Sequence, residues 1–225
     1  ALVVWFVLPK NDEDNHDGKT KNMFITPKLK LLFDKNIFFI AITVVCAYCG
    51  YKGLDNITLY LVQTLNWHEA SAASFAAYAT YLRPISAISA GVIADKFDCS
   101  KTIKNLFLIS ILVYLILFST TPNNHTSWII YLNILLTFVT VFALRGIYFA
   151  LLQDAQFPQS KTGVIVGFVS LIGYTPDIFF GSLTGRILDN SPGVAGHQNY
   201  FLFLMVISIL GLITTYFLSR NKKVK

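Results

Sequence analysis

Six long apolar stretches constrain what this 225-residue chain can fold into. A helix of about 20 residues crosses the hydrocarbon core of a bilayer, and each stretch comes close to that length or exceeds it. Only 13% of the residues are charged while 54% are hydrophobic, so a soluble fold could not cover its apolar surface. The sequence therefore predicts an all-α, polytopic membrane protein. Its six expected transmembrane helices cover residues 36–64, 72–94, 103–121, 127–151, 162–187 and 199–219.

Basic residues lie mainly on one side of these predicted helices. Lysine and arginine concentrate in residues 9–35, 95–104 and 220–225, whereas the loops at alternate helix ends are almost free of them. Cytoplasmic loops of membrane proteins carry an excess of lysine and arginine, so residues 9–35 and the C-terminus are predicted to be cytoplasmic. We therefore expect a multi-pass protein of the cell (inner or plasma) membrane.

The chain divides into four predicted parts. Residues 1–8 are apolar but too short to cross a bilayer, which indicates the end of a truncated membrane helix. Residues 9–35 are predicted to be a polar cytoplasmic linker, 36–219 a six-helix transmembrane bundle and 220–225 a cytoplasmic tail. The lipid bilayer is thus an expected partner.

Several classes of function are not expected. The net charge of +6 lies in clusters beside apolar stretches and not along an aromatic-lined stripe, so nucleic acid is not an expected partner. Cys46 and Cys49 are spaced C-x-x-C inside an apolar run, where we expect packing residues and no metal. All four histidines fall in the predicted linker or outer loops, so we expect neither an enzyme nor a cofactor. They are His16, His68, His125 and His197.

One short turn carries a motif, Gly91-Val-Ile-Ala-Asp95-Lys96-Phe-Asp98-Cys-Ser-Lys101. Gly91 would permit close helix approach, and the Asp95 carboxylate could cap a helix or pair with basic groups of the loop. Lys96 would anchor the turn at the anionic inner leaflet. The alternative is an ordinary short loop whose charges only set the topology.

The motif resembles the short-loop signature of the major facilitator superfamily, G-x-x-x-D-[RK]-x-G-[RK]-[RK], in the copy between that family's eighth and ninth helices. Gly91, Asp95 and Lys96 match it, whereas Asp98 replaces the glycine and Cys99-Ser100 replaces the basic pair. The order of a cut helix, a basic linker and six spans extends the resemblance over essentially the whole chain. It implies the C-terminal half of a twelve-helix transporter, with Gly91, Asp95 and Lys96 in a cytoplasmic gating loop and an N-terminal six-helix half missing.

Two further segments carry a finer resemblance. The runs Arg145-Gly-Ile-Tyr-Phe-Ala and Gly173-Tyr-Thr-Pro-Asp177 are similar to a bacterial branch of that family related to sugar-acid and organophosphate carriers. The mechanism that the family resemblance implies is alternating access, in which two halves rock around a central site.

Five ionisable residues fall inside predicted membrane helices, where an unpaired charge costs several kcal/mol. They are Lys52, Asp55, Arg83, Arg145 and Asp177. A spacing of three puts Lys52 and Asp55 on one helix face, where they can pair. One alternative is internal neutralisation, with Arg83 or Arg145 paired to Asp177 as well. The other is that some of these groups contact a substrate or a coupling ion.

The three cations exceed the two carboxylates, and this surplus suits an anion. A guanidinium binds phosphate, sulfonate or carboxylate groups through two parallel hydrogen bonds. We therefore expect Arg83, Lys52 and Arg145 to bind substrate, and Asp55 and Asp177 to form switching ion pairs or carry a coupling proton. The tyrosines near these charges, which could hydrogen-bond a sugar-like body, are Tyr51, Tyr81, Tyr148 and Tyr174.

The favoured function is a secondary active transporter, a symporter or an antiporter, for a small polar and anionic organic solute. Its coupling partner would be a proton or a counter-anion. The alternative is a channel or a structural membrane subunit in which the intramembrane charges form internal salt bridges.

Small residues recur at a spacing of four in two of the predicted helices. Glycine or alanine at such a spacing permits close helix crossing, and in the resembled family these helices meet the other half. The pairs are Gly163 with Gly167, Gly181 with Gly185, and Ala72 with Ala76.

The predicted topology can be tested by labelling. Cysteines placed at Asn66, Asn124 and Ser191 should react with an impermeant thiol reagent on intact cells, because these positions lie in the loops poor in basic residues. A cysteine at Asn124 that reacts only after lysis would reverse the orientation.

Overall fold

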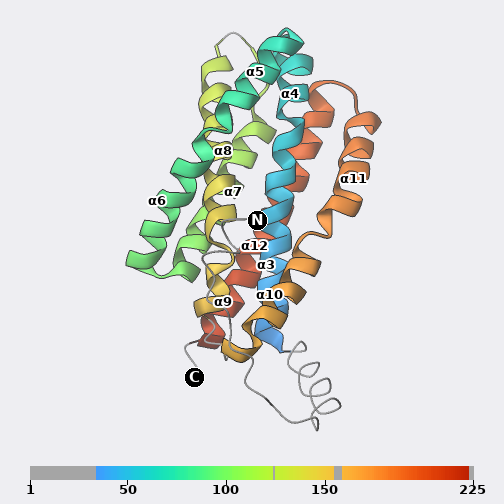
Figure 1. The fold of residues 1–225 in the computed structure, drawn as a ribbon. Helices are drawn as coiled ribbons and strands as arrows, with labels where there is room; N and C mark the ends of the chain where they lie inside the picture. The colour runs from blue at the N-terminus through green and yellow to red at the C-terminus, as the bar shows by residue number, and fades with distance from the viewer. Residues whose placement is uncertain (1–33, 124, 155–158, 223–225) are drawn as a thin grey trace, which may run out of the picture.

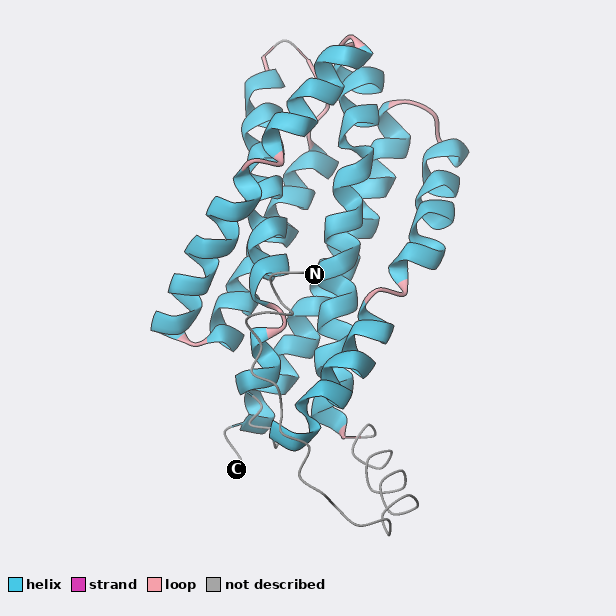
Figure 2. Cartoon of the chain, viewed as in Figure 1, coloured by secondary structure: helices cyan, strands magenta, loops and turns pink. Residues whose placement is uncertain are grey.

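The computed structural model is a bundle of helices (Figures 1 and 2), and it describes residues 34–123, 125–154 and 159–222. The predicted parts 1–8 and all but the end of 9–35 lie outside the described residues. The elements are α3 (Lys35–Gly53), a 3₁₀ turn η1 (Leu54–Asn56), α4 (Ile57–Leu65), α5 (Glu69–Ala79), α6 (Leu82–Phe97), α7 (Cys99–Ser119), α8 (Ser127–Ile147), α9 (Ala150–Asp154), α10 (Gln159–Gly173), α11 (Pro176–Asn190) and α12 (Val194–Lys222).

The described residues contain five helices long and apolar enough to cross a membrane. They correspond to the first and the third to sixth predicted spans, with ends shifted by a few residues, and they confirm the all-α membrane fold. The last helix, α12, continues to Lys222 and so takes up the first part of the predicted tail 220–225. The five spans are Lys35–Leu65, Cys99–Ser119, Ser127–Ile147, Thr162–Asn190 and Val194–Arg220.

The second predicted span, 72–94, is divided between α5 and α6, which follow one another along one edge of the bundle (Figure 1). Pro84 explains the division, because it has no N–H to donate to the carbonyl of Thr80. That carbonyl accepts instead from the amide of Arg83 at 3.0 Å, an i to i+3 bond that tightens the turn. The interruption therefore lies beside an arginine at membrane depth.

Two buried hydrophobic clusters stack along the bundle, and α3 belongs to both. Residues of α3 from Ile37 to Ala47 belong to the cluster at the end where α3 and α7 begin. Cys49 and the segment Leu54–Leu61 belong to the cluster at the opposite end. Tyr48 lies between these two sets along the chain and belongs to neither cluster.

Two helices cross closely at a glycine that the sequence analysis did not single out. A Cβ built on Gly146 of α8 would lie 2.8 Å from the Cβ of Ala87 and 2.9 Å from its Cα, on α6. The crossing of α6 and α8 therefore requires glycine at this position.

Other glycines have open space around them within the described part of the chain. A Cβ built on Gly91 would meet no atom within 4 Å, so the close helix approach expected there does not occur against a described residue. Four further helix glycines are equally open. Ala72, by contrast, is fully buried within this chain. The open glycines are Gly91, Gly163, Gly167, Gly181 and Gly185.

This contrast gives a matched pair of substitutions. Gly146→Ala should lower the free energy of unfolding by about 1–3 kcal/mol, because the added methyl group meets backbone that cannot move aside. Gly163→Ala adds the same group into open space and should be neutral, or stabilising by up to about 1 kcal/mol. Thermal unfolding of the purified protein in detergent measures both. Equal effects of the two substitutions would contradict the α6–α8 crossing.

Candidate functional site

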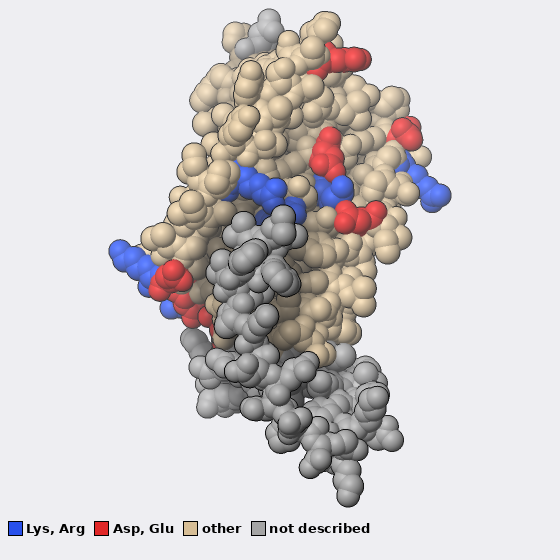
Figure 3. Space-filling view, in the orientation of Figure 1, with Lys and Arg blue, Asp and Glu red and all other residues tan. Residues whose placement is uncertain are grey.

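Three interrupted spans bring polar groups to the middle of the bundle. The first is interrupted at η1, the second between α5 and α6, and the third at Tyr174 and Thr175 between α10 and α11. Interrupted helices in membranes are found where backbone lines a cavity or is buried in protein. On the face shown in Figure 3, acidic and basic side chains gather at mid-height, where an apolar surface would be expected for a membrane span.

Lys52 is the centre of an ion-pair cluster. Its Nζ lies 2.8 Å from Oδ2 of Asp55 and 3.8 Å from Oδ1 of Asp177. The 3₁₀ turn that begins at Leu54 helps the first pair, because residues three apart are eclipsed in a 3₁₀ helix. Lys52 therefore neutralises carboxylates from two separate spans.

Asp177 has a second partner, the hydroxyl of Tyr48. This hydroxyl donates to both carboxylate oxygens, at 3.1 and 2.9 Å. Asp177 also lies in the first turn of α11 after Pro176, where the helix dipole favours a negative charge. The Asp177 carboxylate thus has two partners among the described residues, Lys52 and Tyr48, and neither is an arginine.

These contacts decide between the pairings considered from the sequence. The Lys52–Asp55 pair predicted from the spacing is present. The pairing of Arg83 or Arg145 with Asp177 is wrong, because the only cation within 4.0 Å of that carboxylate among the described residues is Lys52. Which cation faces which carboxylate depends on the rotation of neighbouring helices, and spacing along one helix does not determine that rotation.

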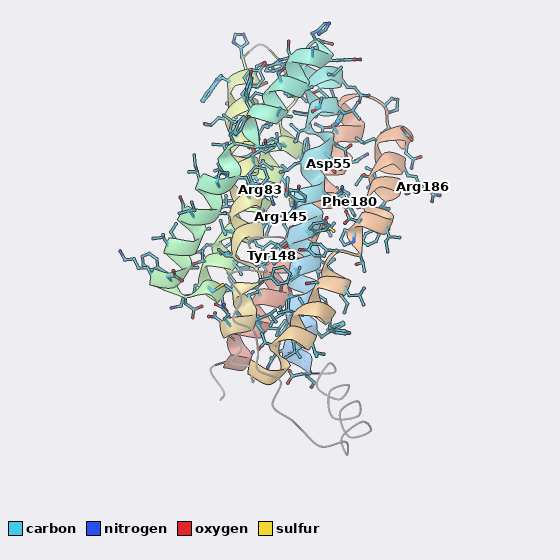
Figure 4. The ribbon with its side chains drawn as sticks, in the orientation of Figure 1. Asp55, Arg83, Arg145, Tyr148, Phe180 and Arg186 are labelled. Carbon is cyan, nitrogen blue, oxygen red and sulfur yellow. The ribbon has the colours of Figure 1, made fainter. Side chains whose placement is uncertain are left out.

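The two arginines gather around Tyr51 instead. The guanidinium carbon of Arg145 lies 3.6 Å from the centroid of the Tyr51 ring, and that of Arg83 lies 5.9 Å from it. Stacking on an aromatic face stabilises a guanidinium but leaves its N–H groups free to donate. Figure 4 shows both arginines and Asp55 near the middle of the bundle, at similar height.

Neither arginine is neutralised within the described residues, where the ion pairs are those of Lys52. The Nη1 atom of Arg145 is buried and has no hydrogen-bond partner there. A buried donor of a charged group without a partner costs about 1–3 kcal/mol or more. The arrangement therefore leaves donors available to an oxyanion.

A cavity of about 260 Å³ opens beside these groups. Arg83, Asp55 and Tyr51 contribute to its wall, together with the backbone turn at Thr80 and the predicted interface residue Ala76. Cation, carboxylate and aromatic ring therefore line one volume, to which α3, η1, α4, α5, α6 and α8 contribute. Its remaining lining residues are Leu54, Thr58, Ala77, Phe138 and Phe142.

The predicted tyrosines divide into two groups. The Tyr148 and Tyr174 hydroxyls lie 3.4 Å apart, and the Tyr174 ring packs edge-on against Tyr48 with centroids 4.8 Å apart. Tyr51, Tyr148 and Tyr174 thus join the charged cluster, whereas Tyr81 is 74% exposed. The sequence analysis missed Tyr48, although its position four residues before Lys52 puts it on the same face of α3.

The predicted gating-loop residues Gly91, Asp95 and Lys96 lie within α6, and Asp98 alone joins α6 to α7. Asp95 and Lys96 are exposed, and Lys96 lies over the Phe97 ring, 5.4 Å from its centroid. Asp98 has a backbone φ of +88°, a region that favours glycine, which is the residue of the resembled motif at this position. Its Oδ1 accepts from the backbone N–H groups of Ser100 and Lys101 at 2.8 and 3.4 Å, which caps α7.

The expected position of one histidine is wrong. His197 lies inside α12, not in an outer loop, because the helix begins at Val194. It is 1% exposed, and its Nε2 lies 2.9 Å from Oε1 of Gln63. Within the described ranges no cluster of three or more metal-ligating side chains occurs.

Similar proteins were found both by sequence and by structure. A model of the Major Facilitator Superfamily matches residues 1–180. The inner membrane protein YihN of Escherichia coli (strain K12) is 31% identical over 233 residues, which cover 98% of this chain and 54% of YihN. An uncharacterized protein of Mycoplasma pneumoniae is 24% identical over 197 residues, which cover 77% of this chain and 88% of that protein.

A solved structure shares the fold. It is the crystal structure of a bacterial homologue of the human lysosomal transporter Spinster, in an inward-facing and unoccupied conformation. The TM-score is 0.60 at 13% sequence identity, and the match covers 97% of this chain and 56% of that one. This chain therefore spans about half the length of YihN and of the Spinster homologue.

The ion pairs of Lys52 predict that substitutions in this cluster destabilise the protein to different degrees. Lys52→Met leaves two carboxylates without their cation and should lower the free energy of unfolding by about 1–3 kcal/mol. This is less than the roughly 3–5 kcal/mol of a fully buried pair, because both carboxylates are partly exposed. Asp55→Asn should cost less, since Lys52 keeps Asp177.

The control is Arg186→Met, which removes a cation from an exposed position on α11 (Figure 4) and should leave the melting temperature unchanged. Thermal unfolding in detergent measures all three variants. A Lys52→Met protein as stable as the control would contradict the ion-pair cluster.

Proposed function

This chain belongs to the Major Facilitator Superfamily, and from that premise we propose that it forms half of a secondary active transporter for a small organic anion. The apolar helices and the inner membrane relative support a multi-pass membrane location. In this proposal residues 9–35 and the C-terminus are cytoplasmic, as the distribution of lysine and arginine indicates.

The observation that carries the proposal is the charge balance of the site. Lys52 binds both intramembrane carboxylates and Tyr48 also donates to Asp177, while Arg83 and Arg145 stack on Tyr51 without a carboxylate partner among the described residues. Two guanidinium groups at membrane depth require a counter-charge. A phosphate, sulfonate or carboxylate in the adjoining cavity supplies it, because it can accept two parallel N–H bonds from one guanidinium.

The body of the substrate would occupy the 260 Å³ cavity between Arg83 and Asp55. Tyr51 lines this cavity, and Tyr174 lies near the same cluster through Tyr48. Ring faces and hydroxyl groups of this kind suit a polyhydroxylated solute, for which sugar acids and sugar phosphates are the natural probes.

The open glycines support a second half as partner. A Cβ on Gly163, Gly167, Gly181 or Gly185 meets no described atom within 4 Å, and such small-residue faces permit close helix packing. We propose that an N-terminal six-helix half packs there and that the two halves alternate access to the central site.

Coupling would use the two carboxylates. Asp55 shares the cavity wall with Arg83 and the salt bridge with Lys52. An anion that binds beside Lys52 competes with Asp55 for the same ammonium group, so substrate binding would release a carboxylate. That carboxylate can then take a coupling proton in a symporter, while a counter-anion would replace the substrate in an antiporter.

The second candidate is a channel or a structural subunit, and the Lys52 ion pairs favour it because they link two spans without any substrate. In that case the arginines would matter for assembly alone. The two candidates differ in whether an arginine variant loses anion binding or stability.

The test compares conservative arginine variants. Arg83→Lys and Arg145→Lys keep the charge but lose the planar pair of donors, so anion affinity should fall between about tenfold and a hundredfold while the protein still folds. Arg186→Lys, on the exposed side of α11, is the matched control. Ligand-induced shifts in melting temperature, measured with sugar phosphates, sulfonates and sugar acids on the protein with its N-terminal half, give the affinities.

Two results would overturn the proposal. One is an undiminished anion-induced shift in both Arg83→Ala and Arg145→Ala. The other is that no anion shifts the wild-type melting temperature while both arginine variants fail to assemble, which would favour the structural subunit.

A further inference from the structure

Far from the central cavity, α7 and α12 form two adjoining pockets on the outer side of the bundle. A polar pocket of about 280 Å³ lies where α7 begins and α12 ends. A groove of about 570 Å³ continues from it between the same two helices. Lys104 and Tyr216 line both, so the two volumes meet at these side chains.

The polar pocket is basic. Lys101, Lys104 and Arg220 line it against a single carboxylate, that of Asp98. Asp98 already accepts the backbone N–H groups that cap α7, and none of the three cations forms an ion pair with a described residue. The pocket therefore keeps an excess of positive charge.

One of the cations of this pocket connects its two helices. The Nζ of Lys104 donates to the Ser219 hydroxyl at 3.2 Å, which holds the lysine side chain across from α7 to α12. The Tyr216 ring is 53% exposed at the junction with the groove. Two ammonium groups, one guanidinium and three hydroxyl-bearing side chains thus line a volume that suits a phosphate diester.

The groove is apolar and opens away from the bundle. Leu108, Ile213 and Phe217 line it and are 47%, 45% and 44% exposed. All three belong to helices that are long and apolar enough to cross a membrane, so the groove faces hydrocarbon when the protein is in a bilayer. A soluble anion would fill the polar pocket and leave the groove empty.

We propose that α7 and α12 bind one anionic phospholipid, with its phosphate among Lys101, Lys104 and Arg220 and an acyl chain in the groove. Basic pockets between membrane helices at a cytoplasmic surface are suited to anionic headgroups, and the distribution of charge along the sequence predicts that this end is cytoplasmic. The site shares no lining residue with the central cavity, so it stands independently of the transported solute.

The first experiment compares ligands on the wild-type protein. Purified, delipidated protein in detergent is titrated with dioleoylphosphatidylglycerol, dioleoylphosphatidylcholine and glycerol 3-phosphate, and bound lipid is counted by native mass spectrometry alongside the melting temperature. We expect phosphatidylglycerol to bind at least fivefold more tightly than phosphatidylcholine, and an equal concentration of glycerol 3-phosphate not to displace bound phosphatidylglycerol.

Variants then test each part of the site. Lys104→Gln and Arg220→Gln should each weaken phosphatidylglycerol about fivefold, which is the effect of one lysine or arginine near an anionic surface. Lys35→Gln removes an exposed cation at the same end of the bundle, outside both pockets, and should change nothing. Ile213→Trp should fill the groove and weaken binding, whereas Leu210→Trp, exposed on α12 outside the groove, should not.

Three outcomes would overturn the proposal. Equal binding of the two lipids would mean that the basic pocket does not select charge. Displacement of bound phosphatidylglycerol by an equal concentration of glycerol 3-phosphate would mean a soluble anion site. Equal losses in Lys104→Gln and Lys35→Gln would mean that only general surface charge attracts the lipid. The wild-type comparison stands without any variant, so poor folding of one variant leaves the test intact.

Discussion

The arrangement of the charged groups in the bundle depends on the two ion pairs that the Lys52 ammonium group forms. An ionised group at membrane depth must be paired or hydrated, and Lys52 meets this need for Asp55 on its own span and for Asp177 on another. One ammonium group serves two carboxylates, and the arginines of the same region have no carboxylate partner among the described residues. The proposed anion site rests on this surplus of cations and not on the mere presence of intramembrane charges.

The interruptions of the helices follow from residues that the sequence shows directly. Pro84 and Pro176 each remove a backbone donor, and Gly50 and Gly53 weaken the first span just before its 3₁₀ turn. The apolar stretches themselves placed the five charged residues inside predicted membrane helices. The length of the second helix could not be predicted in the same way, because apolar residues continue on both sides of the turn at Thr80 and hide the division into α5 and α6.

What the sequence could not supply is contact between spans. Periodicity places residues on a face of one helix, but the bond from Tyr48 to Asp177 and the stacking of Arg145 on Tyr51 depend on how neighbouring helices are rotated. The same limit applies to His197, whose buried contact with Gln63 joins α12 to α4. The sequence therefore named charged residues that the structure brings together, but it could not determine which cation faces which carboxylate.

The longer of the two Lys52 ion pairs is made to the span that is least buried. The distance from Lys52 to Asp177 is 3.8 Å, against 2.8 Å to Asp55, and Thr162–Asn190 is the least buried of the five spans. Ile178, next to Asp177, is 84% exposed. A Cβ built on Gly181 or Gly185, later in the same helix, would meet no described atom within 4 Å. In the proposed function, an anion that draws Lys52 toward the arginines would loosen α11 first. Because α11 carries one of the two carboxylates and also the open glycine face on which the proposed N-terminal half would pack, the proposal connects occupancy of the site to contact between the two halves.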